Sequence, residues 1–157
     1  MLFRSNPSVG LLAHSGQVDV RITANAATEA EADALIAPIE SQIRERLGEF
    51  IYGVGDETVE GVVGRLLAAR GKTLAVAEAG TEGQLAGRLA ALPQAAEVFR
   101  GGQLMAQVDV AAEAERVQAE RKADWGMAVR VGAKPEGGKQ IEIAMTDGDH
   151  PESRTQG

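Results

Sequence analysis

The fold of this chain is decided by the stretch Thr73-Leu74-Ala75-Val76-Ala77-Glu78-Ala79-Gly80-Thr81-Glu82-Gly83-Gln84-Leu85-Ala86. The run from Leu74 to Ala77 is apolar without alternation, which is typical of a strand buried on both faces of a parallel sheet. After the polar loop, we predict a helix that begins at Thr81 and stops at Pro93. A strand, a tight loop and a helix in this order form the building unit of an α/β layered domain.

Other segments around this stretch repeat the same alternation. The segment that follows Asp56 or Thr58 carries apolar residues every 3.6 positions up to Gly71, which predicts a helix closed by that glycine. The alternating order of helices and strands predicts a shortened α/β/α layered domain with a mainly parallel sheet over residues 54–147. We predict a flexible polar tail at 148–157. The remaining elements of the domain are predicted as strands at 99–107, 125–131 and 141–145 and a helix at 111–122.

The first 53 residues have a different pattern. Residues 9–13 and 18–23 are predicted as a hairpin turning at residues 14–17, because apolar and polar residues alternate in the second run. A helix is predicted from Thr28 to Leu47, where Thr28 and Glu31 have the spacing of a capping box. Residues 50–53 are interpreted as a short strand. We therefore predict a separate β/α portion over residues 1–53.

The composition excludes several classes of function. A net charge of −7 argues against a nucleic-acid partner, which requires clustered lysine and arginine. The chain has no cysteine, and His14 and His150 are far apart in the sequence, so we expect no metal site and no cofactor. No segment reaches the roughly 18 consecutive apolar residues of a membrane span. The expectation is a cytoplasmic protein with no membrane partner.

Two loops are candidates for ligand binding. The loop from Glu78 to Gly83 lies between a strand and a helix, where α/β proteins place ligands and where free backbone N–H groups favour anions. It can equally be an ordinary connection in which Thr81 caps the helix, and Glu82 places negative charge where a phosphate would lie. The glycine-rich segment Gly132 to Gly138, with Lys134, can cradle a phosphate or simply join two strands.

No nucleophilic site can be assembled from these residues. None of the five serines lies in a loop between a strand and a helix. The sequence also offers no serine–histidine–aspartate set in the alternating part of the chain.

The stretches quoted above, together with residues 12–24 and 52–60, resemble the CinA family. That resemblance implies a KH-like middle domain over residues 1–53 and a C-terminal nicotinamide-nucleotide amidohydrolase domain after it. In that family the loop reads Ala-Glu-Ser-Cys-Thr-Gly-Gly, and its serine is the proposed nucleophile. The resemblance places Ala79 at the serine, Gly80 at the cysteine and Glu82 at the first glycine.

A second part of the family site is also altered. A family strand end that supplies a tyrosine to the pocket aligns with Ala106, so Ala79 and Ala106 both occupy catalytic positions. The ligand-binding positions implied by the resemblance and the loops together are Glu78, Gly80, Thr81, Gly83, Gly101, Gly102, Gly132 and Lys134.

These residues predict a CinA-like fold that is catalytically impaired and acts as a ligand-binding or assembly module, with a nicotinamide nucleotide as the ligand. The alternative is an active amidohydrolase that converts nicotinamide mononucleotide to nicotinate mononucleotide by water attack, with Glu78 as the base. A third hypothesis is a homo-oligomer assembled through alanine-rich helices.

Overall fold

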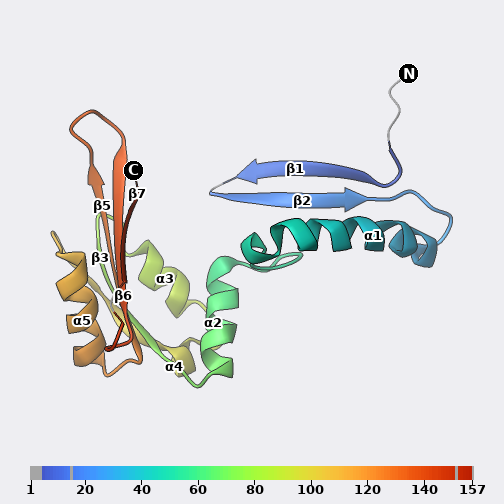
Figure 1. Cartoon of the computed structure of the whole chain (residues 1–157). Coiled ribbons are helices and arrows are strands. Elements are labelled where there is room, and N and C mark those ends of the chain that lie inside the picture. The colour runs from blue at the N-terminus through green and yellow to red at the C-terminus, as the bar shows by residue number, and fades with distance from the viewer. Residues whose placement is uncertain (1–4, 15, 151, 157) are drawn as a thin grey trace. The chain divides into compact units, whose positions relative to one another are not determined.

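The structure is a computed structural model that describes residues 5–14, 16–150 and 152–156. The chain divides into two compact units, Met1–Val54 and Gly55–Gly157. Each unit has its own sheet and helices (Figure 1).

The first unit is a hairpin with one long helix. Strands β1 (Ser8–His14) and β2 (Gln17–Thr23) pair antiparallel, as predicted, although Ser15 of the predicted turn lies outside the described residues. Helix α1 (Glu29–Leu47) packs against β2 and contains Pro38. Thr28 caps the helix as predicted, because the Glu31 N–H donates to Thr28 Oγ1 over 3.3 Å. The second bond differs from that of a standard capping box, because the Glu31 carboxylate accepts from the Ala27 N–H over 3.1 Å, one residue before the cap.

The strand predicted at residues 50–53 does not form. A 3₁₀ turn, η1 (Gly48–Phe50), extends the end of α1, and the chain then continues without regular structure. The described residues of this unit offer no third strand for this apolar run to pair with. Instead, the Tyr52 hydroxyl donates to Gln17 Oε1 over 2.6 Å, which ties the segment to the start of β2.

The second unit is built on one mixed sheet. Its described strands have the spatial order β4 (Phe99–Leu104), β3 (Leu74–Ala79), β5 (Trp125–Ala133), β6 (Lys139–Thr146) and β7 (Glu152–Gln156). The α/β prediction is confirmed. Strands β4, β3 and β5 are parallel, whereas β6 is antiparallel to both of its neighbours, β5 and β7, because short connections join these strands; the sheet is therefore mixed.

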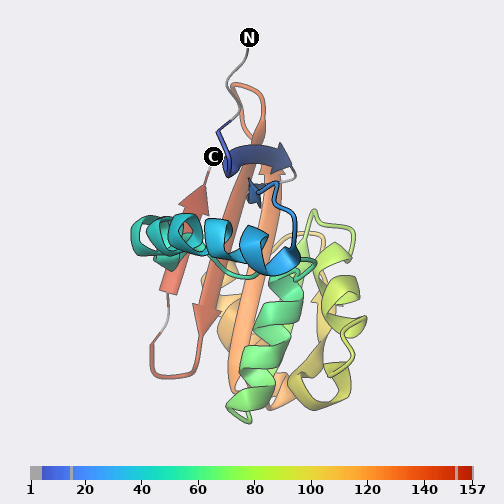
Figure 2. The ribbon, with the colours of Figure 1, turned by 90° about the vertical axis from the view of Figure 1, so that its right-hand side faces the viewer.

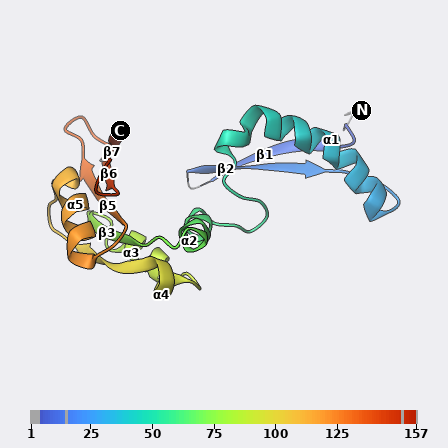
Figure 3. The same ribbon diagram turned by 60° about the horizontal axis from the view of Figure 1, so that its bottom comes forward.

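Helices cover both faces of this sheet. Helix α5 (Val110–Arg121) packs on one face against β3, β5 and β6. Helices α3 (Gln84–Ala90) and α4 (Ala95–Val98) pack on the other face, and α2 (Val59–Ala69) packs against them (Figures 1 and 2). Figure 3 shows the layers from below, with α5 and the group α2–α4 on opposite sides. Every residue of β3 is buried between these layers, as the sequence predicts.

The end of the chain differs from the prediction of a flexible tail at 148–157. Residues 152–156 form β7, which pairs with β6 in register from Met145 opposite Glu152 to Ile141 opposite Gln156. The segment is polar because β7 is an exposed edge strand, and sheet edges favour polar residues.

The amino ends of β3 and β5 are joined by a hydrogen-bond network around Asp124. Its carboxylate accepts from Lys72 Nζ (2.9 Å), the Thr73 N–H (2.9 Å) and Thr73 Oγ1 (2.8 Å). These contacts, first that with Lys72, lower the pKa of Asp124 to about 2. The network fixes the two central strands at the end of the sheet opposite the loop Glu78–Gly83.

Candidate functional site

The predicted site loop leaves β3 at a fully buried carboxylate. Glu78 is 0% exposed, and both of its carboxylate oxygens are hydrogen-bonded. Oε2 accepts from Thr81 Oγ1 (2.5 Å) and from the Leu85 N–H (3.2 Å), whereas Oε1 accepts from the Ala86 N–H (2.9 Å). The carboxylate therefore satisfies the N–H groups at the start of α3, where the sequence suggested that an anion could bind.

The helix start predicted at Thr81 is wrong for the same reason. Helix α3 begins at Gln84, with Gly83 as its N-cap in the left-handed region at φ +79°. The Thr81 hydroxyl is directed to Glu78 instead of to a helix N–H. Glu82 precedes the cap at φ +56°, a conformation that a residue with a Cβ rarely adopts.

The two positions that the resemblance assigns to the family's Ser-Cys pair are both enclosed by the protein. Ala79 is 3% exposed and belongs to the core cluster between the sheet and α5. Gly80 has φ +74°, and a Cβ built on it would lie 2.1 Å from the Val131 carbonyl oxygen. Position 80 is therefore restricted to glycine in this backbone.

The other predicted ligand residues do not gather at this loop. Gly101 and Gly102 lie within β4, and a Cβ on Gly102 would lie 2.6 Å from Ala86 Cβ, so this glycine permits α3 to approach the strand closely. Gly132 lies in β5, and the Lys134 N–H donates to Gly138 O (3.1 Å) in the β5–β6 turn. Ala106 is exposed in the segment after β4.

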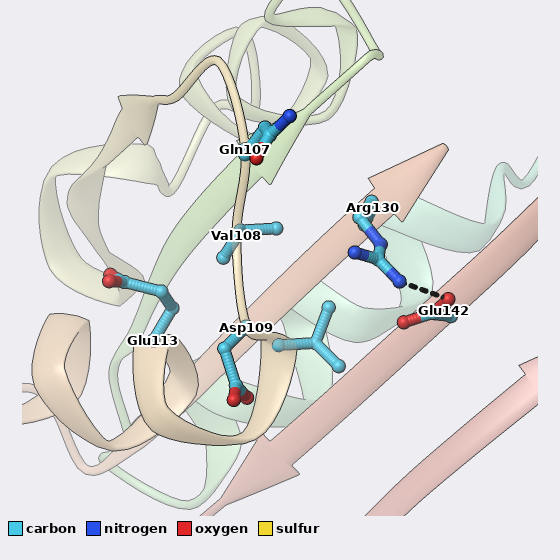
Figure 4. Close-up of a pocket in the computed structure, with 7 residues that line it drawn as sticks. Gln107, Val108, Asp109, Glu113, Arg130 and Glu142 are labelled. Atoms are coloured by element: carbon cyan, nitrogen blue, oxygen red, sulfur yellow. Dashed lines mark hydrogen bonds and ion pairs between the residues drawn. The ribbon is translucent and has the colours of Figure 1, made fainter. Parts of the chain in front are cut away.

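A polar cavity of about 490 Å³ lies beside the carboxyl end of β3 (Figure 4). It is formed where the segment before α5 passes the middle of β5 and β6. Arg130 enters it from β5, where it pairs in register with Ala79, and forms an ion pair with Glu142 of β6. The residues that line the cavity are Gln107, Val108, Asp109, Val110, Glu113, Arg130 and Glu142.

The cavity walls are mainly acidic. Asp109 caps α5, because its Oδ1 accepts from the Ala111 N–H (3.1 Å) and the Ala112 N–H (3.3 Å). Glu113 accepts from Arg116 Nε over 2.6 Å, and its hydrogen bond raises the pKa of that guanidinium. Three carboxylates and one guanidinium line the space, so its local charge favours a cationic group in a ligand.

Sequence reasoning missed all seven residues that line the cavity, although it named the adjacent Ala106. The signal that could have found them is Arg130, a single charged residue within the otherwise uncharged run 125–133. Among the described lining residues there is no serine, threonine, cysteine or histidine. In the parts of the chain that the structure describes, no group of acidic, histidine or cysteine side chains could hold a metal ion, and no helix is long and apolar enough to cross a membrane.

Comparisons with known proteins cover both units. Residues 1–53 match the family model described as "Damage-inducible protein CinA KH domain", and residues 56–109 match "CinA C-terminal domain". A CinA-like protein of Frankia casuarinae is 50% identical over 109 residues, which are 69% of this chain and 25% of that protein. A CinA-like protein of a Synechococcus species is 35% identical over an alignment of 161 positions, which covers 88% of this chain and 38% of that protein.

Solved structures show the same fold. The competence or damage-inducible protein from Enterobacter asburiae superposes with a TM-score of 0.53 at 20% identity, over 64% of this chain and 84% of that one. A CinA superfamily protein from Enterobacter cloacae has a TM-score of 0.52 at 22% identity, over 66% of this chain and 82% of that one. This chain spans about a quarter to two fifths of the curated relatives described above. With both of its units matched, the chain belongs to the CinA family.

Proposed function

We propose that this chain is a CinA-like module that has the scaffold of a nicotinamide-nucleotide amidohydrolase without its turnover, and that it acts by binding. The observation that supports this most directly is that Ala79, at the end of β3 where the resemblance places the family's nucleophile, is a buried alanine. Loss of a nucleophile costs on the order of 10⁶ in rate in a well-studied serine hydrolase. Background catalysis of that size would not support a metabolic role.

The geometry weighs against the alternative of water attack with Glu78 as the base. A general base needs a free lone pair within hydrogen-bond reach of the water that it deprotonates. Three hydrogen bonds from α3 and Thr81 use three of the roughly four lone-pair sites of the Glu78 carboxylate, and the side chain has no exposed surface through which water reaches the fourth. The carboxylate is therefore better suited to hold α3 on the sheet than to accept a proton from water.

Turnover is the first test. The purified chain is incubated with nicotinamide mononucleotide and ammonia is measured, with a competent family amidohydrolase as the positive control in the same assay. We expect no release above the blank. Release at enzyme-like rates would overturn the proposal and bring back the alternative.

A Glu78→Gln variant must be accompanied by a fold control. The glutamine NH₂ group would face donors that now point at a carboxylate oxygen, so the start of α3 would lose acceptors. Loss of turnover in this variant supports a base role only if its circular dichroism and unfolding midpoint match those of the unmodified chain.

The ligand that we propose for the cavity is the nicotinamide nucleotide itself, oriented by charge. Its pyridinium ring is cationic and suits Asp109, Glu113 and Glu142, whereas its phosphate can only use Arg130, which already pairs with Glu142. The deamidated product carries one more negative charge. The cavity should therefore favour the amide over the acid.

Isothermal titration of both nucleotides tests this preference. We expect the amide to bind more tightly than the acid, and a Glu142→Gln variant to narrow the difference, with Glu152→Gln on β7 as the matched control. Equal affinities, or tighter binding of the acid, would contradict the assignment of the ligand to this cavity. Binding without ammonia release would support the non-catalytic role.

A further inference from the structure

A second hollow of the second unit lies between α2 and the connection from α3 to α4. Its volume is about 490 Å³. One wall is a single stripe along α2, from the N-cap Thr58 through Val62 to Ala68, because residues three or four apart share a helix face. Residues 92–94 form the other wall. We call this space the α2 groove, and it shares no lining residue with the cavity of Figure 4.

The α2 groove is kept open by a glycine that the helix itself does not need. Gly61 is the third residue of α2, where a capping box usually carries glutamate, so the cap at Thr58 is compatible with a side chain. A Cβ at Gly61 would lie 3.1 Å from Thr58 Oγ1 and would otherwise enter open space. Gly64 is different, because a Cβ there would lie 2.6 Å from Gln94 Nε2. Glycine destabilises a helix relative to alanine, so packing accounts for Gly64 and only the open groove accounts for Gly61.

The side-chain amide of Gln94 offers hydrogen bonds to this groove. Gln94 precedes α4 but makes no side-chain cap bond to it, and packing holds its side chain against Gly64. Within the described part of the chain, the half-buried amide of Gln94 has no hydrogen-bond partner. It therefore presents one N–H donor and one carbonyl acceptor side by side.

The rest of the α2 groove suits a flat, uncharged ring. Val62 on one wall and Pro93 on the other provide apolar surface on two sides, which is typical of small-molecule sites with few polar groups. The guanidinium of Arg65 forms an ion pair with Glu57, and the exposed carboxylate of Asp56 lies at the same end of the groove. The local charge is therefore negative and disfavours a phosphate.

We infer that the α2 groove binds adenine in the form of an uncharged nucleoside. Adenine carries an amino donor beside a ring-nitrogen acceptor, and this edge forms two hydrogen bonds with a glutamine amide. Hypoxanthine has the same shape but carries a carbonyl in place of the amino group, so it presents two acceptors, and only one of them can bond to Gln94. The inference is independent of the proposed function, because the groove and the cavity of Figure 4 have no residue in common.

Isothermal titration of adenosine, inosine and adenosine monophosphate into the unmodified chain tests the inference. We expect adenosine to bind with a Kd below about 1 mM. Inosine should bind at least about 10-fold more weakly, because it lacks the amino donor. The monophosphate should also bind more weakly than adenosine, because of the carboxylates of Asp56 and Glu57. Absence of adenosine binding at millimolar concentration, or equal affinities for adenosine and inosine, would overturn the inference.

Three variants assign the binding to this groove. Gln94→Arg should reverse the preference and favour inosine, because a guanidinium donates to two neighbouring acceptors. Gly61→Leu should fill the groove and abolish adenosine binding, while circular dichroism and the unfolding midpoint show that the fold is kept. Gly87→Leu on α3 is the matched control, since a Cβ there has nothing within 4 Å and the residue does not line the groove. Adenosine binding that survives Gly61→Leu, or that Gly87→Leu weakens equally, would contradict the inference.

Discussion

Helix α5 approaches the sheet closely at Gly126 of β5, and this approach makes the glycine sensitive to substitution. A Cβ at this position would lie 2.0 Å from the Ala114 carbonyl oxygen and 2.7 Å from Gln118 Cβ. The strand cannot retreat, because Gly126 is paired with Ala75 on one side and Thr146 on the other. In a Gly126→Ala variant, α5 must therefore move outward by more than about 1 Å to restore an ordinary contact.

That displacement sets the expected loss of stability. Ala114 and Val117 are 1% and 0% exposed, and a gap of about 1 Å removes up to about half of the dispersion energy of such contacts. Overpacking in a core typically costs about 1–3 kcal/mol, and the need to move a whole helix places this variant near the upper limit, at about 3 kcal/mol. For a unit of this size, the melting temperature should fall by roughly 10 °C or more.

Urea unfolding of the full chain measures the effect. Trp125, the only tryptophan, lies in β5 and reports on the second unit. The matched control is Gly132→Ala in the same strand, where a Cβ would have nothing within 4 Å, and where the free energy of unfolding should change by less than about 1 kcal/mol. The reasoning is refuted if the two variants unfold within about 0.5 kcal/mol of each other.

Three further predictions follow from local contacts. Lys122 ends α5 in the left-handed region at φ +51°, which glycine adopts more easily than other residues. Lys122→Gly should therefore raise the free energy of unfolding, measured by chemical denaturation, by about 1 kcal/mol, whereas Lys122→Ala should not raise it. Thr81→Val removes one of three donors to the buried Glu78 carboxylate and should cost about 2 kcal/mol, against near zero for the exposed Thr155→Val, measured in the same way. The pKa of Asp124 is lowered to about 2, so its contribution to stability is complete above its ordinary pKa and is lost as pH falls from about 4 to 2. That contribution is about 1 kcal/mol, because the side chain is about one third exposed and solvent weakens its interactions. The free energy of unfolding of Asp124→Asn, measured between about pH 2 and 4, should lack this pH dependence. If the variant keeps the dependence, other groups cause it.

Elements whose signals are local were predicted well from the sequence. The periodicity after Thr58 and the glycine at position 71 predict α2, and the unbroken apolar run of β3 predicts burial on both faces; both are confirmed. These signals depend on neighbours within one turn or one strand. The sequence of an edge strand carries no such signal, and β7 was therefore interpreted as a flexible tail although it pairs with β6.

The site was harder to predict because its contacts depend on how the strands and helices pack against one another. Thr81 has the sequence position of an N-cap, but its role depends on a carboxylate three residues earlier that is buried against the same helix. Arg130 and Glu142 are twelve residues apart and meet only because β5 and β6 are paired in that register. A single sequence gives the residue types, whereas the pairing register decides which of them share a cavity.

The altered loop also bears on the proposal that this chain binds a nucleotide without turnover. If only Ala79 had changed, a single substitution to serine would restore the proposed nucleophile. Gly80 makes this insufficient, because the Val131 carbonyl oxygen occupies the space that a cysteine side chain would need, and Glu82 holds a left-handed conformation where the family has glycine. Among the loop residues that match the family, Glu78 accepts hydrogen bonds from the start of α3, and Gly83 is the N-cap of that helix. Glu78, Thr81 and Gly83 match the family loop and support the scaffold, whereas Ala79 stands where the resemblance places the nucleophile. This pattern supports the proposal that the chain binds without turnover.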